Sequence, residues 1–433
     1  MFWRNPAPSR HLERSVICMQ ETCKRIATLA MQLNPVELVT PTNARKEKDA
    51  IVKVLDNGFK VNPTFKYSRN KLRQAVRVGE QLGDLKAKFL ELAQHYPATH
   101  FDDPAQEQAV KNIIIDRIND AIITTEMAQA ILDGNDIAMA ALSAEKYGTP
   151  SSVIMGYAYD IANDGYPSNC SPYLDADVAK ALKAQEFDAA GILHYFERVL
   201  EMYGITDWLV IVDDQATAID VRDKNSSGRP LVVIPSTRRV DGLKLLELIG
   251  HEIECHLRSS ENARNFWSEI LTDDYLPLVP LLAKSDNEFI YEGYAKQNDT
   301  KVRGSTGLPT PNYLVAMDQA RRGSSFAETM ETIAGFEIQR GATRKQAFSR
   351  AWTATYRVFR GCSNCANGKD VCYSFTKDFA YFGGFHTVNE SDYLDFSSMS
   401  MRDIVKLVEA GVPLNARYEH RWLCLNPWEI GLL

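Results

Sequence analysis

Apolar residues recur at helical spacing through most of the first 200 positions of the 433-residue chain. Between residues 106 and 132, for example, Ile114, Ile118 and Ile122 repeat at intervals of four and therefore share one face of a helix. The same period predicts further helices at about 16–34, 44–55, 70–95, 137–147, 175–185 and 189–203. This part of the chain contains no catalytic motif, so we expect its helices to build a wall around a site that lies elsewhere.

The pattern changes between residues 206 and 235. Runs rich in β-branched and aromatic residues predict short strands at 208–212, 218–221 and 231–234. Helical spacing then returns from about Asp241, and further helices are predicted at 288–297, 326–340, 343–359 and 401–410. We therefore expect an α+β protein that is mainly α, with one small sheet.

Two histidines and a glutamate occur within six residues, in the segment His251-Glu252-Ile253-Glu254-Cys255-His256. This H-E-x-x-x-H spacing is one residue longer than the H-E-x-x-H of zinc proteases, in which both histidines share a helix face. An α-helix turns by about 100° per residue, so histidines five residues apart would point roughly 140° apart. A π-turn, with its i→i+5 hydrogen bond, would bring them to one side. We therefore predict a departure from α geometry between His251 and His256.

The third ligand that such a site needs is predicted to be Glu292, in the segment Tyr291-Glu292-Gly293-Tyr294-Ala295. Glu288, one helical turn earlier, is the alternative. Two histidines and a distant glutamate form a catalytic zinc set that leaves the fourth position open for water. In that set Glu252 is the general base and then the proton donor to the leaving amine. Glu254 is expected to face solvent, and the alternative for the whole segment is an ordinary, partly buried helix.

The H-E-x-x-x-H motif followed by E-G-[LY]-A resembles the tyrosine/phenylalanine carboxypeptidase family. That family includes the microtubule-associated tyrosine carboxypeptidases and the bacterial flavohaemoglobin expression-modulating QEGLA-motif proteins. Residues 62–67, 357–361 and 375–381 resemble other blocks of the family, and the resemblance extends from about Phe59 to the neighbourhood of Glu409.

The chain departs from the family pattern at two positions next to the third ligand. Tyr291 stands where the QEGLA motif has glutamine, and Tyr294 stands where it has leucine, but Glu292 itself is present. The resemblance implies a zincin-like metallopeptidase core with bound Zn²⁺, and removal of a C-terminal Tyr or Phe from a peptide or protein. It divides the chain into a basic helical N-terminal arm (1–58), a helical region packed on the core (59–205), and the catalytic core with C-terminal helices (206–433).

A carboxypeptidase also needs a cation that binds the terminal carboxylate of its substrate, because that charge is costly to remove from water. The family-like blocks offer Arg357, Arg360 and Lys377 for this role, and we expect at least one of them to point into the zinc cleft. Tyr381 could donate a hydrogen bond to the developing oxyanion. For each of these residues, an ordinary salt bridge or packing role is equally compatible with the sequence.

The net charge of −7 is unevenly distributed. Residues 1–77 carry 15 lysines and arginines against 6 acidic residues, a balance of +9, which leaves −16 for the remainder. This basic region could attract an acidic partner, although solvated helix faces would give the same pattern. Its basic residues are not interleaved with stacking aromatics, so nucleic acid is not an expected partner.

The longest apolar run, residues 275–283, is too short to cross a bilayer, and the first residues lack a secretory apolar stretch. The eight cysteines are scattered. Together these features predict a cytoplasmic protein with reduced thiols and no membrane attachment. Cys362, Cys365 and Cys372 could bind a second, structural zinc ion, but such sites usually have four ligands, and a surface loop with free thiols is the preferred interpretation.

Two other functions remain open beside the carboxypeptidase. One is a zinc endopeptidase of the gluzincin type, with an open cleft. The other is a non-catalytic regulatory binding protein with the same fold, although such a protein would have no physical need for the base Glu252.

Overall fold

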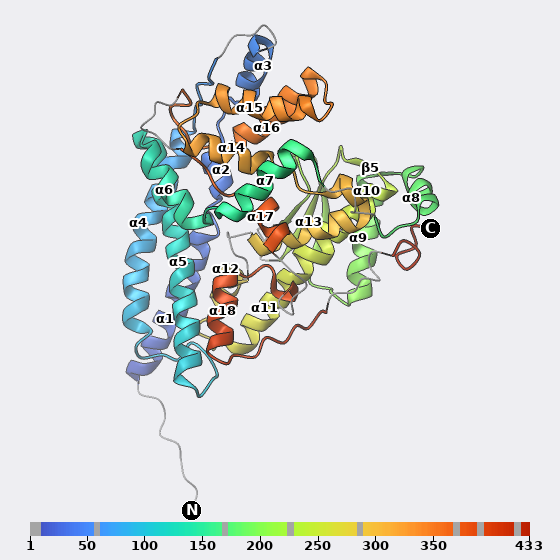
Figure 1. Ribbon diagram of the computed structural model, residues 1–433. Helices are drawn as coiled ribbons and strands as arrows, with labels where there is room; N and C mark the ends of the chain where they lie inside the picture. Colours follow the sequence, from blue (N-terminus) through green and yellow to red (C-terminus); the bar gives the residue numbers. More distant parts are fainter. Residues whose placement is uncertain are drawn as a thin grey trace, which may run out of the picture.

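The computed structural model describes the backbone of residues 10–55, 61–166, 172–222, 229–283, 289–366, 373–387, 394–419 and 426–433. The described chain is mainly helical and contains two small sheets, which confirms the α+β, mainly α, class (Figure 1). Three long helices, α1 (Arg10–Ala30), α4 (Arg69–Leu92) and α5 (Pro104–Asp133), pack side by side along one side of the molecule (Figure 1).

The predicted helices of the first 200 residues are present with small shifts of their ends. The other helices of this part of the chain are α2 (Pro35–Val39), which was not predicted, α3 (Ala44–Leu55), α6 (Asp136–Tyr147), α7 (Ser152–Asp164), α8 (Ala176–Lys183) and α9 (Ala189–Tyr203). Helix α7 was not predicted, because its apolar residues do not leave a polar face that would reveal the helical period. Its first turn is stabilised by Ser151, whose hydroxyl accepts a hydrogen bond from the Ile154 N–H.

The main sheet has the strand order β2-β4-β3, formed by β2 (Leu209–Asp213), β4 (Leu231–Pro235) and β3 (Asp220–Arg222). Strand β4 runs parallel to β2 and antiparallel to β3, and all five of its residues are buried. The three strands predicted from the sequence are therefore confirmed. A second, two-stranded sheet, which was not predicted, pairs β1 (Glu186–Asp188) with β5 (Arg239–Asp241).

A continuous helical rod follows β5 and consists of α10 (Gly242–Leu248), the π-helix η1 (Ile249–Leu257) and α11 (Arg258–Ile270). The rest of the chain forms α12 (Val279–Leu282), α13 (Phe289–Arg303), α14 (Asn312–Arg321), α15 (Phe326–Gln339), α16 (Arg344–Val358), α17 (Phe379–Thr387) and α18 (Met401–Glu409), with short 3₁₀ turns at Leu276–Leu278, Gly304–Gly307 and Leu394–Phe396. Strand β3 and helix α13 both pack against η1.

The π-helix lies between two hydrophobic cores. Ile249, Ile253 and Leu257 pack into the core that surrounds the main sheet. Cys255 packs into another core, which α1, α4 and α5 share with Tyr294 of α13. Apolar contacts on both sides therefore fix the position of η1. In the part of the chain that the structure describes, no helix is long and apolar enough to cross a membrane.

Candidate metal centre

The two histidines of the H-E-x-x-x-H motif lie on the same side of η1, with their ring centroids 4.8 Å apart. The prediction of a departure from α geometry is confirmed, and the π-helical stretch covers all of Ile249–Leu257, more than the single turn that the spacing required. His256 is buried and the His251 side chain is only 18% exposed. The π-helix thus makes it possible for two residues five apart to face a common point.

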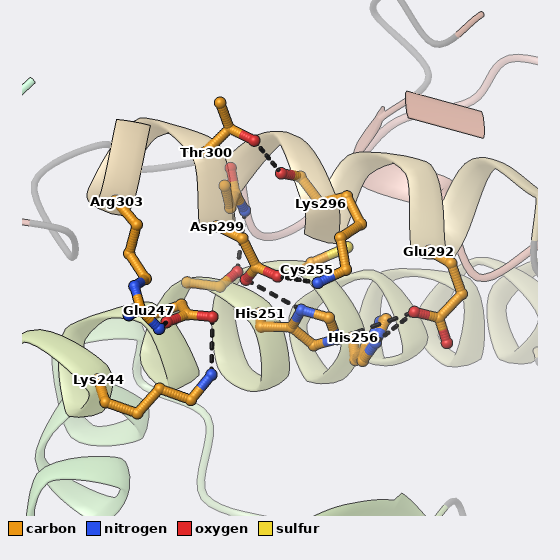
Figure 2. Close-up of polar contacts among 12 residues, drawn as sticks. Lys244, Glu247, His251, Cys255, His256, Glu292, Lys296, Asp299, Thr300 and Arg303 are labelled. Carbon is orange, nitrogen blue, oxygen red and sulfur yellow. Dashed lines mark hydrogen bonds and ion pairs between the residues drawn. The ribbon is translucent and has the colours of Figure 1, made fainter. Parts of the chain in front are cut away.

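Glu292 completes the cluster from the first turn of α13. Its Oε2 lies 3.8 Å from Nε2 of His251 and 3.8 Å from Nε2 of His256 (Figure 2). One ligand atom from each of the three residues lies within 4.8 Å of the others. The three residues predicted as ligands are therefore brought together. Glu288, the alternative, lies outside the described residues.

The position of Glu292 depends on a close contact between α13 and α17. A Cβ added to Gly293 would lie 2.3 Å from the backbone carbon of Gly384, and one added to Gly384 would lie 2.0 Å from the Phe289 carbonyl oxygen. The two helix backbones therefore touch at the residue that follows Glu292. This contact explains the glycine of the E-G-x-A segment, since any side chain there would force the helices apart.

Asp299 orients the first histidine by binding the ring nitrogen that faces away from Glu292. Its Oδ1 lies 3.1 Å from Nδ1 of His251, and its Oδ2 is 2.5 Å from Nζ of Lys296 (Figure 2). With Asp299 on Nδ1, the Nε2 atom of His251 is left to face Glu292. Sequence reasoning missed this residue. The one available signal was its interval of seven residues, or two helical turns, from Glu292 on the same helix.

Charge interactions between Asp299 and His251 shift the pKa of both groups in the metal-free protein. Burial lowers the pKa of His251, but Asp299, together with the charges of Glu252 and Glu292, outweighs that effect and raises it from 6.5 to about 9. Burial raises the pKa of Asp299, but His251 and Lys296 together lower it from 3.8 to about 2. The carboxylate therefore stays ionised at neutral pH and continues to hold the imidazole.

The second histidine is positioned by an aromatic ring. The ring of Tyr291 stacks on that of His256, with centroids 3.7 Å apart and planes inclined by 20°. Tyr291 is itself buried. Tyrosine at the position of the motif's glutamine therefore has a direct structural role, because it limits rotation of the His256 imidazole.

Glu252 lies beside the first ligand, and its carboxyl is desolvated. Burial raises its pKa from 4.5 to about 7, His251 opposes the shift, and the charges of Asp299 and Asp220 add to it. A carboxylate with a pKa near neutrality can both accept and return a proton at physiological pH. This is the property that the predicted general base requires.

Glu254 was expected to face solvent, and this expectation is wrong. The residue is fully buried, accepts a hydrogen bond from the Tyr203 hydroxyl and lies 3.4 Å from Nε of Arg258. Its neighbour Cys255 points away from the cluster and donates from Sγ to the Tyr291 carbonyl at 3.2 Å. Both residues therefore stabilise the helix and its surroundings.

The predicted substrate-binding residues gather around one buried carboxylate, Asp378. Arg360 is buried with Nη2 at 2.8 Å from Asp378, and Arg357 is 3.3 Å from the same carboxylate. Burial raises the pKa of Asp378, but Arg357, Arg360 and Lys377 lower it overall, so it remains ionised. The predicted role of these three cations in the zinc cleft stays a prediction.

Arg357 is the more accessible of the two arginines, with 30% of its side chain exposed. Its guanidinium lies between two tyrosine rings, 5.1 Å from the centroid of Tyr313 and 5.4 Å from that of Tyr381, and Nη1 donates to the Tyr313 hydroxyl. Tyr381 lies on α17, one helical turn before the contact of Gly384 with Gly293. The Arg357–Tyr381 pair is thus linked to the helix that carries Glu292.

The cysteines outside the motif do not form a second metal group among the described residues. Cys362 and Cys365 are buried, not on a surface loop as expected, and Sγ of Cys362 lies 3.5 Å from Oδ2 of Asp136. Cys372 lies outside the described residues. His251, His256 and Glu292 form the group of metal-ligand type found in the described part of the chain.

The donor set of this group fits zinc. Zinc is commonly bound by imidazole nitrogen and carboxylate oxygen at about 2.0–2.2 Å, so two ligand atoms on one tetrahedral ion lie roughly 3.4 Å apart. The observed 3.8 Å between Glu292 and each histidine is close to that spacing and longer than a hydrogen bond. A hydrogen-bonded carboxylate behind one ligand histidine, as Asp299 provides, is a usual companion of zinc.

Two comparisons with known proteins found no relative. A scan against protein-family models and a search of curated proteins both returned no match. The resemblance to the tyrosine/phenylalanine carboxypeptidases therefore stays a prediction based on the motif residues.

Proposed function

We propose that this protein is a zinc-dependent metallocarboxypeptidase that removes a C-terminal residue, Tyr or Phe, from a peptide or protein substrate. The observation that carries the proposal is the convergence of His251, His256 and Glu292 within 4.8 Å, next to a desolvated glutamate. Each partner of this set has a physical task in peptide hydrolysis, and the ordinary-helix alternative gives no reason for their convergence.

Each residue of the site has a separate role in the proposed peptide hydrolysis. Bound zinc supplies Lewis-acid chemistry, because it polarises a carbonyl group and makes water more acidic. The Glu252 carboxylate accepts a proton from the attacking water and then delivers it to the nitrogen of the leaving amine. Asp299 keeps the His251 ring in one orientation and one tautomer throughout. Tyr291 limits rotation of the His256 ring plane by stacking on it.

A zincin-like core is the finer fold assignment that we propose. It is supported by a small sheet that precedes the helix carrying the H-E-x-x-x-H motif, with only the short strand β5 between them. Strand β3 packs against η1 and lies at the edge of the sheet, as far as the described residues extend. An extended substrate could pair with this strand through backbone hydrogen bonds and so present its scissile bond to the cluster.

Specificity for a free C-terminus would require a cation and an apolar wall. Arg357 is the best placed of our three candidates, because it is partly exposed and lies between the rings of Tyr313 and Tyr381. An aromatic side chain of the substrate could pack on such rings while the guanidinium binds the carboxylate. Tyr381 remains our candidate for the hydrogen bond to the oxyanion.

A gluzincin-type endopeptidase is the second candidate, and one observation favours it. Asp378 already lies within ion-pair distance of both Arg357 and Arg360, and Arg360 is buried. If Asp378 neutralises both cations, no selection for a terminal carboxylate would follow from them, and internal peptide bonds would be cleaved as well.

Paired peptides separate the two candidates. A peptide that ends in tyrosine and its C-terminal amide are incubated with the zinc-loaded protein, and the products are identified by mass spectrometry. The carboxypeptidase releases tyrosine from the free acid and leaves the amide intact, whereas an endopeptidase cleaves both. Absence of cleavage by the wild type, at a level matched by Glu252→Gln, would support the non-catalytic binding protein instead.

Two further properties belong to this proposal. The four cysteines with described side chains, Cys23, Cys255, Cys362 and Cys365, are free thiols, which supports a cytoplasmic, reducing environment. The basic N-terminal region, residues 1–77, supports an acidic protein as substrate or partner through long-range attraction.

A further inference from the structure

The helical rod that carries the histidines must return from π to α geometry at Arg258. In α geometry each N–H bonds the carbonyl four residues earlier, and in π geometry the carbonyl five residues earlier. Where π geometry changes back to α geometry, two successive backbone N–H groups therefore bond to carbonyls on either side of one carbonyl and skip it. Here the Arg258 N–H is shared between the carbonyls of Ile253 and Cys255 and passes over the carbonyl of Glu254 between them.

A side chain supplies a donor to that carbonyl. Nε of Arg258 donates to the Glu254 carbonyl oxygen at 2.9 Å, and both residues are fully buried. A buried carbonyl requires a partner, and water has no access here. The guanidinium is itself fixed by the carboxylate of Asp395 and by the Tyr418 carbonyl at 2.8 Å. Arg258 thus makes the exit from π geometry compatible with a dry interior.

A second buried side chain binds the other end of the turn. Nδ2 of Asn298 donates to the Gly250 carbonyl at 2.8 Å, and Gly250 directly precedes His251. Asn298 is fully buried on α13, next to Asp299, which binds the His251 ring. Two consecutive residues of the helix that carries Glu292 therefore hold the backbone and the side chain at the start of the motif.

We propose that Asn298 and Arg258 are positioning residues, which hold the π-helical turn at its two ends and thereby keep His251 and His256 on one side of the helix before any metal binds. The proposal rests on the zinc-binding role proposed above for the two histidines. Without these side chains the segment would relax toward α geometry, in which the histidines diverge by roughly 140°. Neither residue belongs to the His251, His256 and Glu292 group, so their effect should appear in the affinity for the metal and in its coordination.

The test compares two buried asparagines of matched chemistry. Asn298→Ala removes the donor to Gly250, whereas Asn312→Ala removes a buried amide of α14 that donates to Oε1 of Glu337 at 2.8 Å, away from the motif and from the partners of Arg258. Zinc affinity of the full-length variants is measured by competition with a chelator. We expect Asn298→Ala to lose about 10–100-fold in affinity, as is usual when a hydrogen-bond partner behind a metal ligand is removed, and Asn312→Ala to stay near the wild type.

Cobalt(II) in place of zinc provides a spectroscopic readout, since its visible absorption depends on coordination number. We expect an altered cobalt spectrum in Asn298→Ala and an unaltered one in Asn312→Ala. Arg258→Lys, which keeps a positive charge but lacks Nε, should behave like Asn298→Ala; if this variant does not fold, the asparagine pair decides. Equal loss of affinity in both asparagine variants, or no loss in Asn298→Ala, would overturn the proposal.

Failure of the proposed function would be recognised separately. If the wild-type protein binds no zinc, the metal role is wrong, and crystal structures of the metal-free proteins then test the positioning role alone. Histidines that diverge in Asn298→Ala but not in Asn312→Ala support it. Histidines that stay together in both variants refute it.

Discussion

Replacing Asp299 with asparagine should change how zinc affinity depends on pH, and the size of the change follows from the pKa of His251. In the metal-free protein burial lowers that pKa, but Asp299, with smaller contributions from Glu252 and Glu292, raises it overall from 6.5 to about 9. The change from 6.5 to about 9 corresponds to about 3 kcal/mol in favour of the imidazolium. Zinc needs the neutral ring, so protons compete with the metal in the wild type.

The competition can be worked out from the two pKa values. With a pKa of about 9, roughly one His251 in 100 is neutral at pH 7, and about half are neutral at pH 9. Apparent zinc affinity of the wild type should therefore rise about 50-fold between pH 7 and pH 9. In Asp299→Asn the pKa should return toward 6.5, so affinity should rise less than about twofold over that range.

The intrinsic affinity of the variant should be lower by about 10–100-fold, because the carboxylate no longer orients the ring or supports its charge. The two effects oppose each other at pH 7 and separate at pH 9, where the full intrinsic loss becomes visible. Chelator competition at pH 7, 8 and 9 measures both effects. Asp403→Asn, in a buried ion pair with Arg117 outside the site, is the control. Parallel pH curves for wild type and Asp299→Asn would refute the reasoning.

Three other changes have defined outcomes. Glu252→Gln should keep zinc and lose turnover. Because the pKa of Glu252 is raised from 4.5 to about 7 in the folded protein, the ionised carboxylate lowers the free energy of unfolding of the metal-free protein by up to about 3 kcal/mol above pH 7 and has no effect below pH 4.5. In urea denaturation this variant should therefore be more stable than the wild type at pH 8 but not at pH 4. Gly293→Ala should separate α13 from α17 and so lower both Tm and zinc affinity. The control, Gly335→Ala, has open space around the added Cβ and should stabilise the protein by about 0.5–1 kcal/mol. Equal Tm values for the two variants would contradict the close contact between Gly293 and Gly384. Tyr291→Phe should preserve the ring stacked on His256 and the zinc affinity, whereas Tyr291→Ala should weaken zinc binding, which calorimetry measures. Equal zinc affinities for the two variants would mean that the ring does not position His256.

The parts of the site that the sequence predicted are those governed by local geometry. The rotation of about 100° per residue was enough to require a π-turn between His251 and His256, and η1 provides it. Glu292 could be predicted because it lies in a distinctive segment with a glycine after it. The helices with a clear polar face were also found, with errors of a few residues at their ends.

The features that sequence reasoning missed depend on contacts between distant segments. Glu254 is buried because Tyr203, Arg258 and the surrounding core neutralise and enclose it, and none of these contacts is visible in the local pattern. The requirement for Gly293 comes from Gly384, about 90 residues later, where two backbones touch. Asp299 is one of 56 acidic residues and differs from the others only in what it faces. Each is a tertiary effect, for which a single sequence contains little signal.

The central claim is that a π-helical turn holds two histidines five residues apart on one zinc ion. Anomalous diffraction at the zinc absorption edge, from crystals of the full-length protein grown with one equivalent of zinc, tests it most directly. We predict one strong peak, bonded to Nε2 of His251, Nε2 of His256 and a carboxylate oxygen of Glu292, with η1 still in π geometry. A zinc ion bound elsewhere, or an unbroken α-helix through the motif, would contradict the account.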